Sequence, residues 1–377
     1  MRITISSTVL SKALRTAYRA VPAKAALPIM ESFRLDASGT RLTVTATSGD
    51  LQVKAPARLL DKAQEEGVCS VPAKKLLDFV NLLPECVLSM VTEGDTMELK
   101  WTKGTTHLPL TAVDEFPEFR NDKGDPVTFD VQAQELLSAL CSTIPSMSRD
   151  SARPVLNGVF FDVHETETRI VATDTRVLTY DTIHSGTSQG GQFTIPAQAA
   201  NLLRSSITKD AAIARITRDR TSVCFNFGDV VIQTSLLEQK YPNYASVIPR
   251  NGSFSGEVVM SRDTLYATIK RLAAFSEKLR MKISPLAMTF SAQDTMNGTS
   301  AVEDCDCSYG GEEMEMGVST SYVMTVLESI KSDNLCISVT DPSRPMVFRD
   351  ADATDSGKLS LCMPLMLQQG SSRTRKN

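Results

Sequence analysis

The chain has 377 residues, 42% of them hydrophobic and 22% charged, with a formal net charge of −4. This is the composition of an ordinary folded protein, and the length is too great for one hydrophobic core, so two or three domains are expected. The acidic balance excludes a protein that coats nucleic acid with its whole surface, but it allows a local basic lining. Because no run of about 18 apolar residues occurs, no membrane-spanning helix is expected.

The first residues, 2–6, alternate like a β-strand and lack the apolar core of a signal peptide. An amphipathic helix is predicted next, because apolar residues recur at i, i+3, i+4, i+7 and i+8 from Leu10 to Tyr18. An antiparallel ladder with a turn at 38–39 follows, and a second helix is expected after Val71. A hairpin around 92–95 and a last strand complete this first unit.

The same features return in the same order further along the chain. A β-branched residue followed by Pro-Ala occurs at 71–73 and 195–197, and an aromatic-Pro-polar-aromatic turn occurs at 116–119 and 241–244. A polar turn that begins with Thr recurs in all three thirds, at 92–95, 217–220 and 340–343. Several matches at one period predict a whole domain repeated three times. The predicted domains span 1–125, 126–253 and 254–367.

Each domain is expected to be α+β, with two helices against antiparallel sheet in the rough order β-α-β-β-β-α-β-β-β. In the third domain, Ser261 is expected to cap a helix. The apolar face of that helix is predicted to carry Leu265, Ile269, Leu272 and Phe275. The polar and basic residues 368–377 are expected to form a disordered tail.

Basic residues gather on the predicted helices. Lys12, Arg15 and Arg19 lie opposite the apolar face of the first helix, and Lys74 opens the second. Further basic residues are assigned to later helices: Arg204, Lys209, Lys270, Arg271, Lys278 and Arg280. One interpretation is a solvated helix surface. The other is a lining that follows backbone phosphates without reading bases, and the gathering of cations on helices of an acidic protein favours it.

Signatures of catalysis are absent from the sequence. It has no G-x-x-x-x-G-K-[ST], H-E-x-x-H or G-x-S-x-G motif and only three histidines. The close pair Cys305 and Cys307 has no second pair beside it, so neither a metal nor another cofactor is expected. The scattered cysteines are interpreted as free core thiols of a protein in a reducing cytoplasm. The protein is therefore not expected to be an enzyme.

Several segments are distinctive in combination. They are LPI (27–29), VPAKKLLDFVNLLPE (71–85), RPVLNG (153–158), VATD (171–174), YPNY (241–244) with VIP (247–249), SEKLR (276–280), GEEMEMGVSTSYVMTVLESIKSDN (311–334) and the ending MPLML (363–367). Together they resemble the bacterial DNA polymerase III β subunit, the sliding clamp family, over essentially the whole chain up to Leu367.

The resemblance implies a head-to-tail homodimer whose six domains close into a ring around duplex DNA, with helices lining the hole. Such a ring is a processivity factor: it slides on DNA of any sequence and tethers the replicative polymerase. The implied partners are duplex DNA, and the polymerase and clamp-loader subunits through short linear motifs; no membrane is involved. DNA contacts are expected at Lys24, Lys74, and Arg149 and Arg153 in the loop before RPVLNG, together with Arg15 and Arg19 of the basic helix.

The resemblance also implies a hydrophobic pocket between the second and third domains, in which a partner peptide would bury a Leu or Phe anchor. The matching positions are Leu156, Thr173, Thr175, Arg176, Leu178, Pro242, Val247, Pro345, Leu361, Met363, Pro364, Leu365 and Met366. The dimer contact is expected between an edge strand with Thr106, Leu108 and Leu110 and the helix end near Ala274 and Phe275.

The chain also departs from the family pattern. Thr175-Arg176-Val177 follows VATD where the family commonly has Gly-His-Arg, and Ser246 stands where an Arg is common. Asp150 disfavours phosphate in its loop, so Arg149 is the expected substitute. These departures bear on partner specificity. The alternative function is a divergent repeat scaffold that binds peptide motifs without encircling DNA.

Overall fold

The computed structural model describes residues 1–119, 125–249, 252–294, 298–352 and 357–366. The tail predicted at 368–377 lies outside these residues. The chain divides into two compact units, the first made of 1–137, 185–189 and 198–238 and the second of 138–184, 190–197 and the chain from 239 onward. Each unit thus combines one terminal repeat with part of the middle repeat, and each is described by itself.

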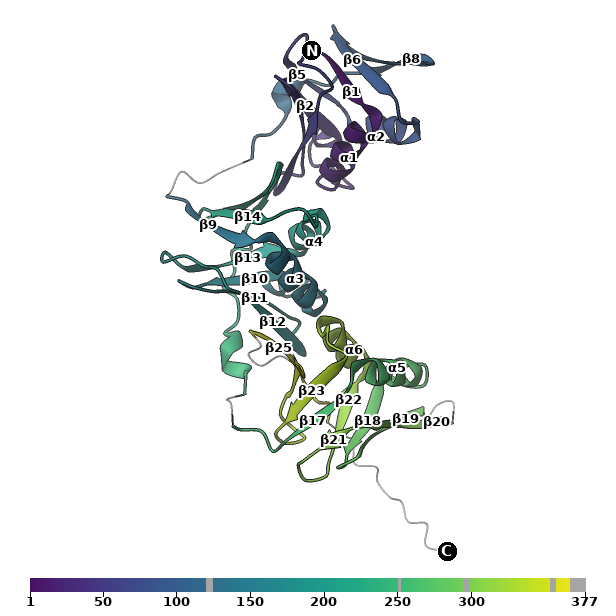
Figure 1. Cartoon of the computed structure of the whole chain (residues 1–377), viewed down its shortest axis with the longest axis vertical. Coiled ribbons are helices and arrows are strands. Elements are labelled where there is room, and N and C mark those ends of the chain that lie inside the picture. Colours follow the sequence, from purple (N-terminus) through teal and green to yellow (C-terminus); the bar gives the residue numbers. More distant parts are fainter. Residues whose placement is uncertain (120–124, 250–251, 295–297, 353–356, 367–377) are drawn as a thin grey trace, which may run out of the picture. The chain divides into compact units, whose positions relative to one another are not determined.

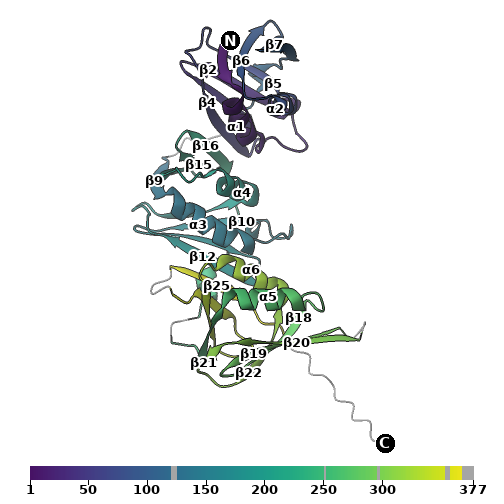
Figure 2. The same cartoon turned by 45° about the vertical axis from the view of Figure 1, so that its right-hand side comes forward.

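The first unit contains two antiparallel sheets. The four-stranded sheet has the order β1-β6-β7-β8, formed by Arg2–Ser6, Val87–Glu93, Thr96–Trp101 and Gly104–Pro109. The eight-stranded sheet has the order β5-β2-β3-β4-β16-β15-β14-β9 (Figure 2). Its strands are, in that order, Gly67–Pro72, Ser32–Ser38, Arg41–Thr47, Leu51–Arg58, Val230–Ser235, Ser222–Phe227, Ile213–Arg218 and Val127–Gln132. The pairing of β4 with β16 makes the first and middle repeats one sheet.

Two helices, α1 (Ser7–Tyr18) and α2 (Ala73–Leu82), pack beside each other in the first unit. The predicted apolar face of α1 is confirmed: Leu10, Ala13, Leu14 and Ala17 are buried, and the helix packs across β3 and β4. The opposite face of α1 therefore points to solvent. The first turn of this helix contains no acidic residue.

The second unit contains a nine-stranded sheet and a four-stranded sheet. The larger has the order β13-β10-β11-β12-β25-β24-β23-β17-β21, and the smaller has the order β20-β19-β18-β22 (Figure 1). The larger is formed by Gly191–Pro196, Gly158–Val163, Thr168–Thr173, Val177–Ile183, Lys358–Cys362, Met346–Asp350, Asn334–Val339, Gly256–Ser261 and Ser308–Tyr309, and the smaller by Thr299–Asp306, Ala287–Asp294, Lys278–Ile283 and Met314–Ser319.

The helices of the last repeat, α5 (Arg262–Leu272) and α6 (Thr320–Ser329), lie side by side in both views (Figures 1 and 2). The predicted N-cap of α5 is confirmed, because the Ser261 side chain accepts a hydrogen bond from the Thr264 amide at 3.3 Å. The middle repeat supplies α3 (Ala133–Thr143) and α4 (Ala197–Ser206), whose residues are divided between the two units.

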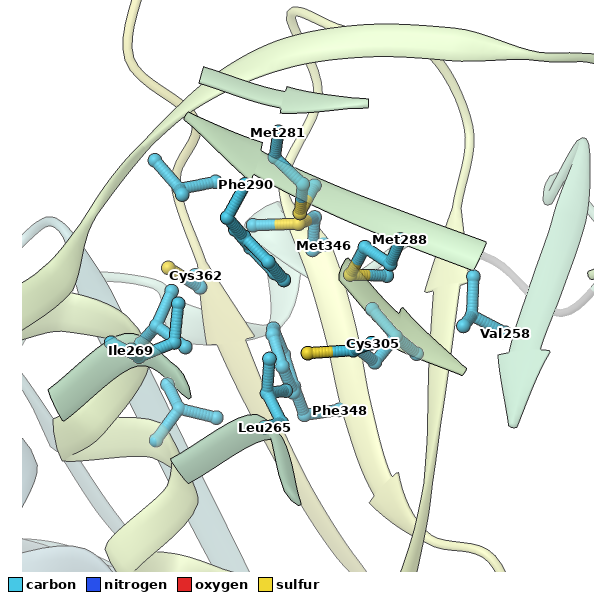
Figure 3. Packing of buried hydrophobic residues seen from close by; sticks show 14 of the residues in the cluster. Val258, Leu265, Ile269, Met281, Met288, Phe290, Cys305, Met346, Phe348 and Cys362 are labelled. Atoms are coloured by element: carbon cyan, nitrogen blue, oxygen red, sulfur yellow. The ribbon is translucent and has the colours of Figure 1, made fainter. Parts of the chain in front are cut away.

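The core of the last repeat is rich in methionine and phenylalanine. Figure 3 shows Phe290 and Phe348 among Met281, Met288 and Met346. Cys362 is completely enclosed in the same core, and burial raises the pKa of its thiol to about 12. Since the thiolate is the reactive form, this cysteine acts as a small core residue.

The joint between the middle and last repeats is the antiparallel pairing of β12 with β25, in which Leu178 lies opposite Leu361. A chain of buried hydroxyl groups crosses this joint. Thr179 Oγ1 of β12 lies 2.8 Å from Ser146 Oγ and 2.9 Å from Ser360 Oγ of β25. Ser360 Oγ in turn lies 2.7 Å from Ser329 Oγ of α6. Each hydroxyl is satisfied by the next, so the chain fixes the two strands in register without leaving a buried polar group unpaired.

Beyond β25, residues 363–366 run next to β22. The Leu365 amide donates to the Gly317 carbonyl oxygen at 2.8 Å, and the Met363 amide donates to the Arg176 carbonyl oxygen at 2.9 Å. A side chain at position 317 would place its Cβ 2.6 Å from the Leu365 carbonyl oxygen. Glycine is therefore required where the two backbones approach so closely.

The structure corrects several sequence-based expectations. Four strands rather than three separate the two helices in the first and middle repeats, and the last repeat adds the short β21. Pro72 and Pro196 are the last residues of strands β5 and β13, and helices α2 and α4 begin at the residues that follow them. Lys278 and Arg280 lie on strand β18, and Lys209 lies beyond the end of α4. Phe275 lies past the end of α5 and is 42% exposed, so it does not belong to the apolar face of that helix.

Thr179→Val should lower the free energy of unfolding by about 1–3 kcal/mol, because Ser146 loses its buried partner. Urea denaturation followed by circular dichroism measures this change. Thr182→Val, on the same strand but outside the hydroxyl chain, is the control. Equal midpoints for both variants would contradict a stabilising role for the chain of hydroxyls.

Gly317→Ala should detach residues 363–366 from β22, because the added methyl group collides with the Leu365 carbonyl. Hydrogen exchange at the Leu365 amide should then become faster by about 10-fold or more, as for a backbone group that has lost its partner. Gly310→Ala is the matched control, since nothing lies within 4 Å of a Cβ at that position. Unchanged protection in Gly317→Ala would show that the segment tolerates the methyl group.

Candidate functional site

A basic surface lies on the helices of the first unit. Lys12 and Arg15 are exposed on α1, Arg19 caps its C-terminal end, and Lys74 is exposed in the first turn of α2. Lys24 is exposed in the segment after α1. A cation is electrostatically disfavoured at a helix N-terminus, so Lys74 contributes nothing to the stability of α2 through the helix dipole.

Hydrogen bonds hold two of these side chains in place without neutralising them. Arg15 Nε donates to Asn81 Oδ1 of α2 at 2.8 Å, and Arg19 donates to the Ser205 hydroxyl of α4. Within the described residues, none of the five cations of this surface makes an ion pair. Elsewhere on the chain, by contrast, the Arg271 guanidinium lies 2.6 Å from a Glu303 oxygen and holds the pKa of that carboxyl below its ordinary value. The helix surface therefore keeps its positive charge available.

The two arginines predicted from the loop before RPVLNG lie in the second unit. Arg149 and Arg153 are both exposed. Asp150, between them, accepts a hydrogen bond from the Ala152 amide at 2.9 Å, and its own amide donates to Ser148 Oγ at 3.0 Å. The carboxylate thus shapes the loop that presents the arginines.

A pocket of about 200 Å³ lies within the second unit. Its lining contains nine of the thirteen predicted positions: Thr173, Thr175, Arg176, Leu178, Pro242, Val247, Pro345, Leu361 and Met363. Leu178 and Leu361 come from facing positions of β12 and β25, so the pocket is built on the joint between the middle and last repeats. Val247 is 52% exposed, which leaves an apolar surface uncovered at the site.

The other four predicted positions lie outside the lining. Leu156 is 2% exposed and packs in the core beneath the pocket, together with Leu178 and Leu361. Pro364 is half-buried on the segment that follows the pocket residue Met363. Leu365 and the 90% exposed Met366 line a separate shallow depression with Met316 and Asp341.

Aromatic residues hold one wall of the pocket. The ring of Tyr241 stacks on Phe160 with centroids 4.4 Å apart, and the Tyr244 hydroxyl donates to Asp162 Oδ2 at 2.7 Å. Burial raises the pKa of the Tyr244 phenol, and the Asp162 carboxylate acts in the same direction, so the phenol stays a donor. These two anchors fix the intervening Pro242 and Asn243 at the pocket.

A tight turn between β11 and β12 forms another part of the pocket lining. Thr173 Oγ1 donates to the Val177 carbonyl oxygen at 2.6 Å and accepts from the Thr175 amide at 3.0 Å. Asp174 Oδ1 accepts from the amides of Arg176 and Val177 at 2.7 and 2.8 Å. The turn places Thr175 at a φ of 80°, in the left-handed region. For a β-branched residue this conformation costs roughly 1–2 kcal/mol.

Sequence reasoning missed three residues of the lining, Val177, Asn243 and Tyr244. Val177 and Asn243 are sequence neighbours of predicted positions, and the YPNY segment contains Asn243 and Tyr244. It also missed Asp162 and Phe160 of β10, which contact Tyr244 and Tyr241. The sequence of one strand does not show which later segment of the chain will pack against it.

The residues predicted for a dimer contact lie at separate places. β8 is an edge strand of its sheet, as predicted; Leu108 is buried against its own sheet, while Thr106 and Leu110 are half-buried. Ala274 and Phe275 are exposed just beyond α5.

No group of three or more potential metal ligands comes together in the described part of the chain. No helix in that part is both long and apolar enough to cross a membrane.

Comparison with known proteins places these features in one family. Three models of the DNA polymerase III beta subunit match in succession: the N-terminal domain at 1–120, the central domain at 130–243 and the C-terminal domain at 245–364. The beta sliding clamp of Salmonella typhimurium is 27% identical, with 97% of this chain and 100% of that protein covered. The beta sliding clamp of Escherichia coli strain K12 is 26% identical with the same coverage.

Solved structures share the fold. The sliding clamp of Pseudomonas aeruginosa bound to griselimycin has a TM-score of 0.92 at 24% identity, covering 97% of this chain and all of that one. The beta subunit of Streptococcus pyogenes DNA polymerase has a TM-score of 0.91 at 21% identity with equal coverage. The predicted fold of three α+β clamp domains is confirmed, and the chain belongs to the DNA polymerase III beta subunit family.

Proposed function

We propose that two copies of this chain close head to tail into a ring around duplex DNA and act as a sliding clamp. Each subunit would contribute the domains 1–125, 126–253 and 254–367. The ring tethers a polymerase by topology rather than by tight contact, so it needs no catalytic group of its own. The edge strand β8 and the exposed residues Ala274 and Phe275 would form the closing contact, in which edge pairing covers open backbone groups.

The observation that carries the DNA contact is the set of unpaired cations on the helices of the first unit. Lys and Arg on a helix face neutralise phosphates without reading bases, so they bind any sequence and release it readily. We assign this role to Lys24, Lys74, Arg15 and Arg19, with Arg149 and Arg153 from the second unit. In an acidic protein, a local basic lining attracts DNA to that surface.

The pocket on the β12–β25 joint is the proposed site for partner proteins. Its apolar walls and exposed Val247 fit one apolar anchor of an extended peptide, such as a linear motif of the replicative polymerase or the clamp loader. Griselimycin, which the Pseudomonas aeruginosa relative binds, is a second proposed ligand of this pocket.

The proposed clamp should be a stable dimer in sizing chromatography and, once loaded, should stay on circular DNA and slide off after linearisation. Lys24→Glu with Lys74→Glu should reduce the retained fraction several-fold and weaken its salt dependence, because phosphate contacts are lost. Co-purification of labelled clamp with nicked plasmid, in the presence of the clamp loader, measures both effects.

The matched control is Lys54→Glu with Lys62→Glu, which reverses two exposed cations of the same repeat that lie on β4 and in the following loop. This control should retain the wild-type fraction on the plasmid. A monomer that never remains on circular DNA would favour the peptide-binding scaffold over the clamp. Equal loss in both double variants would show that net charge, rather than the helix surface, governs retention.

Val247→Glu should weaken binding to the pocket by about 10-fold or more, because it places a charge where an apolar anchor must be desolvated. An array of overlapping peptides from the host's replicative polymerase finds the bound segment, and fluorescence anisotropy with that peptide and with griselimycin gives the affinities. Val259→Glu is the control, since Val259 is similarly exposed on β17 outside the pocket. Unaltered affinity in Val247→Glu would place the binding site elsewhere.

A further inference from the structure

Thr175 has a backbone conformation that, elsewhere in the described chain, only glycines adopt. Within the described residues, Thr175 is the one non-glycine residue with a positive φ, at 80°. The other positive-φ positions are occupied by Gly39, Gly49, Gly94, Gly190, Gly191, Gly228, Gly252 and Gly298. Glycine adopts this region without steric conflict, so a β-branched residue there is strained.

The strain is imposed by the turn and lies at the pocket. The side chains of Thr173 and Asp174 hold the amides of residues 175, 176 and 177, so the turn backbone cannot rotate to relieve Thr175. Thr175 is exposed, and no hydrogen bond of its hydroxyl occurs among the described residues. Its side chain therefore supports nothing inside the protein, yet it lines the pocket. Strain that persists at a ligand site points to a function of the side chain.

We propose that Thr175 is a specificity-determining residue that narrows the pocket and selects peptides by the size of their anchor. This inference rests on the proposed peptide pocket. The branched side chain occupies space that a glycine would leave empty, in a lining that it shares with Val247 and Pro242. A fixed turn cannot move aside for a larger ligand. The pocket therefore takes an aliphatic anchor the size of leucine and disfavours an aromatic ring.

The volume of the side chain, not its hydroxyl, carries this selection. Valine has the same branched shape as threonine and lacks the polar group, whereas serine keeps the hydroxyl and loses one branch. A mismatch of this size in an apolar pocket changes affinity by roughly 10-fold or more. Removing the side chain should also relieve the strain. A variant with glycine at position 175 should therefore lose selectivity and gain stability.

The experiment uses the full-length dimer and the polymerase peptide identified with the array, synthesised with Ala, Val, Leu, Met or Phe at its anchor. Wild type should bind the Leu peptide about 10-fold more tightly than the Phe peptide. Thr175→Gly should bring the two affinities within about 3-fold of each other, while its melting temperature rises by about 2 °C. Thr175→Val should keep the wild-type order of anchors, and Thr175→Ser should fall between wild type and Thr175→Gly.

Two results would overturn the inference. If Thr175→Gly keeps the wild-type ratio of Leu to Phe affinities, Thr175 does not select the anchor, although the pocket stands. If Thr175→Val loses the selectivity, the hydroxyl rather than the volume is responsible. Failure of the proposed pocket gives a different pattern, in which no polymerase peptide binds wild type and Val247→Glu changes nothing; that outcome removes both proposals.

Discussion

The pairing of β12 with β25 is the interaction on which the pocket depends. It joins strands that are far apart in the sequence and sets Leu178 opposite Leu361, so the pocket has walls from two repeats. A slip of β25 by one residue against β12 would turn Leu361 to the other face of the sheet, away from Leu178. The buried hydroxyls of Thr179 and Ser360 prevent such a slip, because they meet only in this register. Binding geometry is thus fixed by backbone pairing and by two small polar side chains.

The structure separates cations that form ion pairs from cations that stay unpaired within the described residues. Arg271, Arg215 and Arg280 each lie within 2.8 Å of a carboxylate oxygen. Those on α1 and α2 have no such partner in the described chain and stay solvated, so an anion that met them would not have to displace a carboxylate. The proposed DNA contact requires such a surface, because cations that neutralise phosphates without reading bases do not hold the ring at one sequence.

Periodic patterns in the sequence predicted the helices and their repeated order, because each repeat must bury one face of each helix, but they did not give the number of strands between the helices. The apolar face of α1 and the cap at Ser261 follow from such local rules. Phe275 fits the same helical spacing but lies beyond the end of α5, since spacing alone does not show where a helix ends. Pro72 pairs with Ser32 of β2 as the last residue of β5, and α2 begins at the next residue, so the same Pro-Ala pair closes the strand and opens the helix.

The candidate site was less accessible from the residues alone. No local pattern brings Leu178 and Leu361 together; only the family resemblance placed both in one pocket. The family resemblance did not predict every position correctly. Leu156 matches a position of the family's pocket but lies in the core below the pocket lining. Neither the local pattern nor the family resemblance predicted the positive φ of Thr175. This φ follows from hydrogen bonds that Thr173 and Asp174 make in the folded turn.

The pairing of β4 with β16 has a consequence for how the chain folds during synthesis. β4 ends at Arg58, but its neighbour in the sheet begins only at Val230. While the ribosome makes the intervening residues, the nascent first repeat presents an open strand edge able to pair with another chain. Completion of the first unit therefore waits for the end of the middle repeat. A fragment that ends between these two repeats would keep that edge uncovered and be prone to self-association.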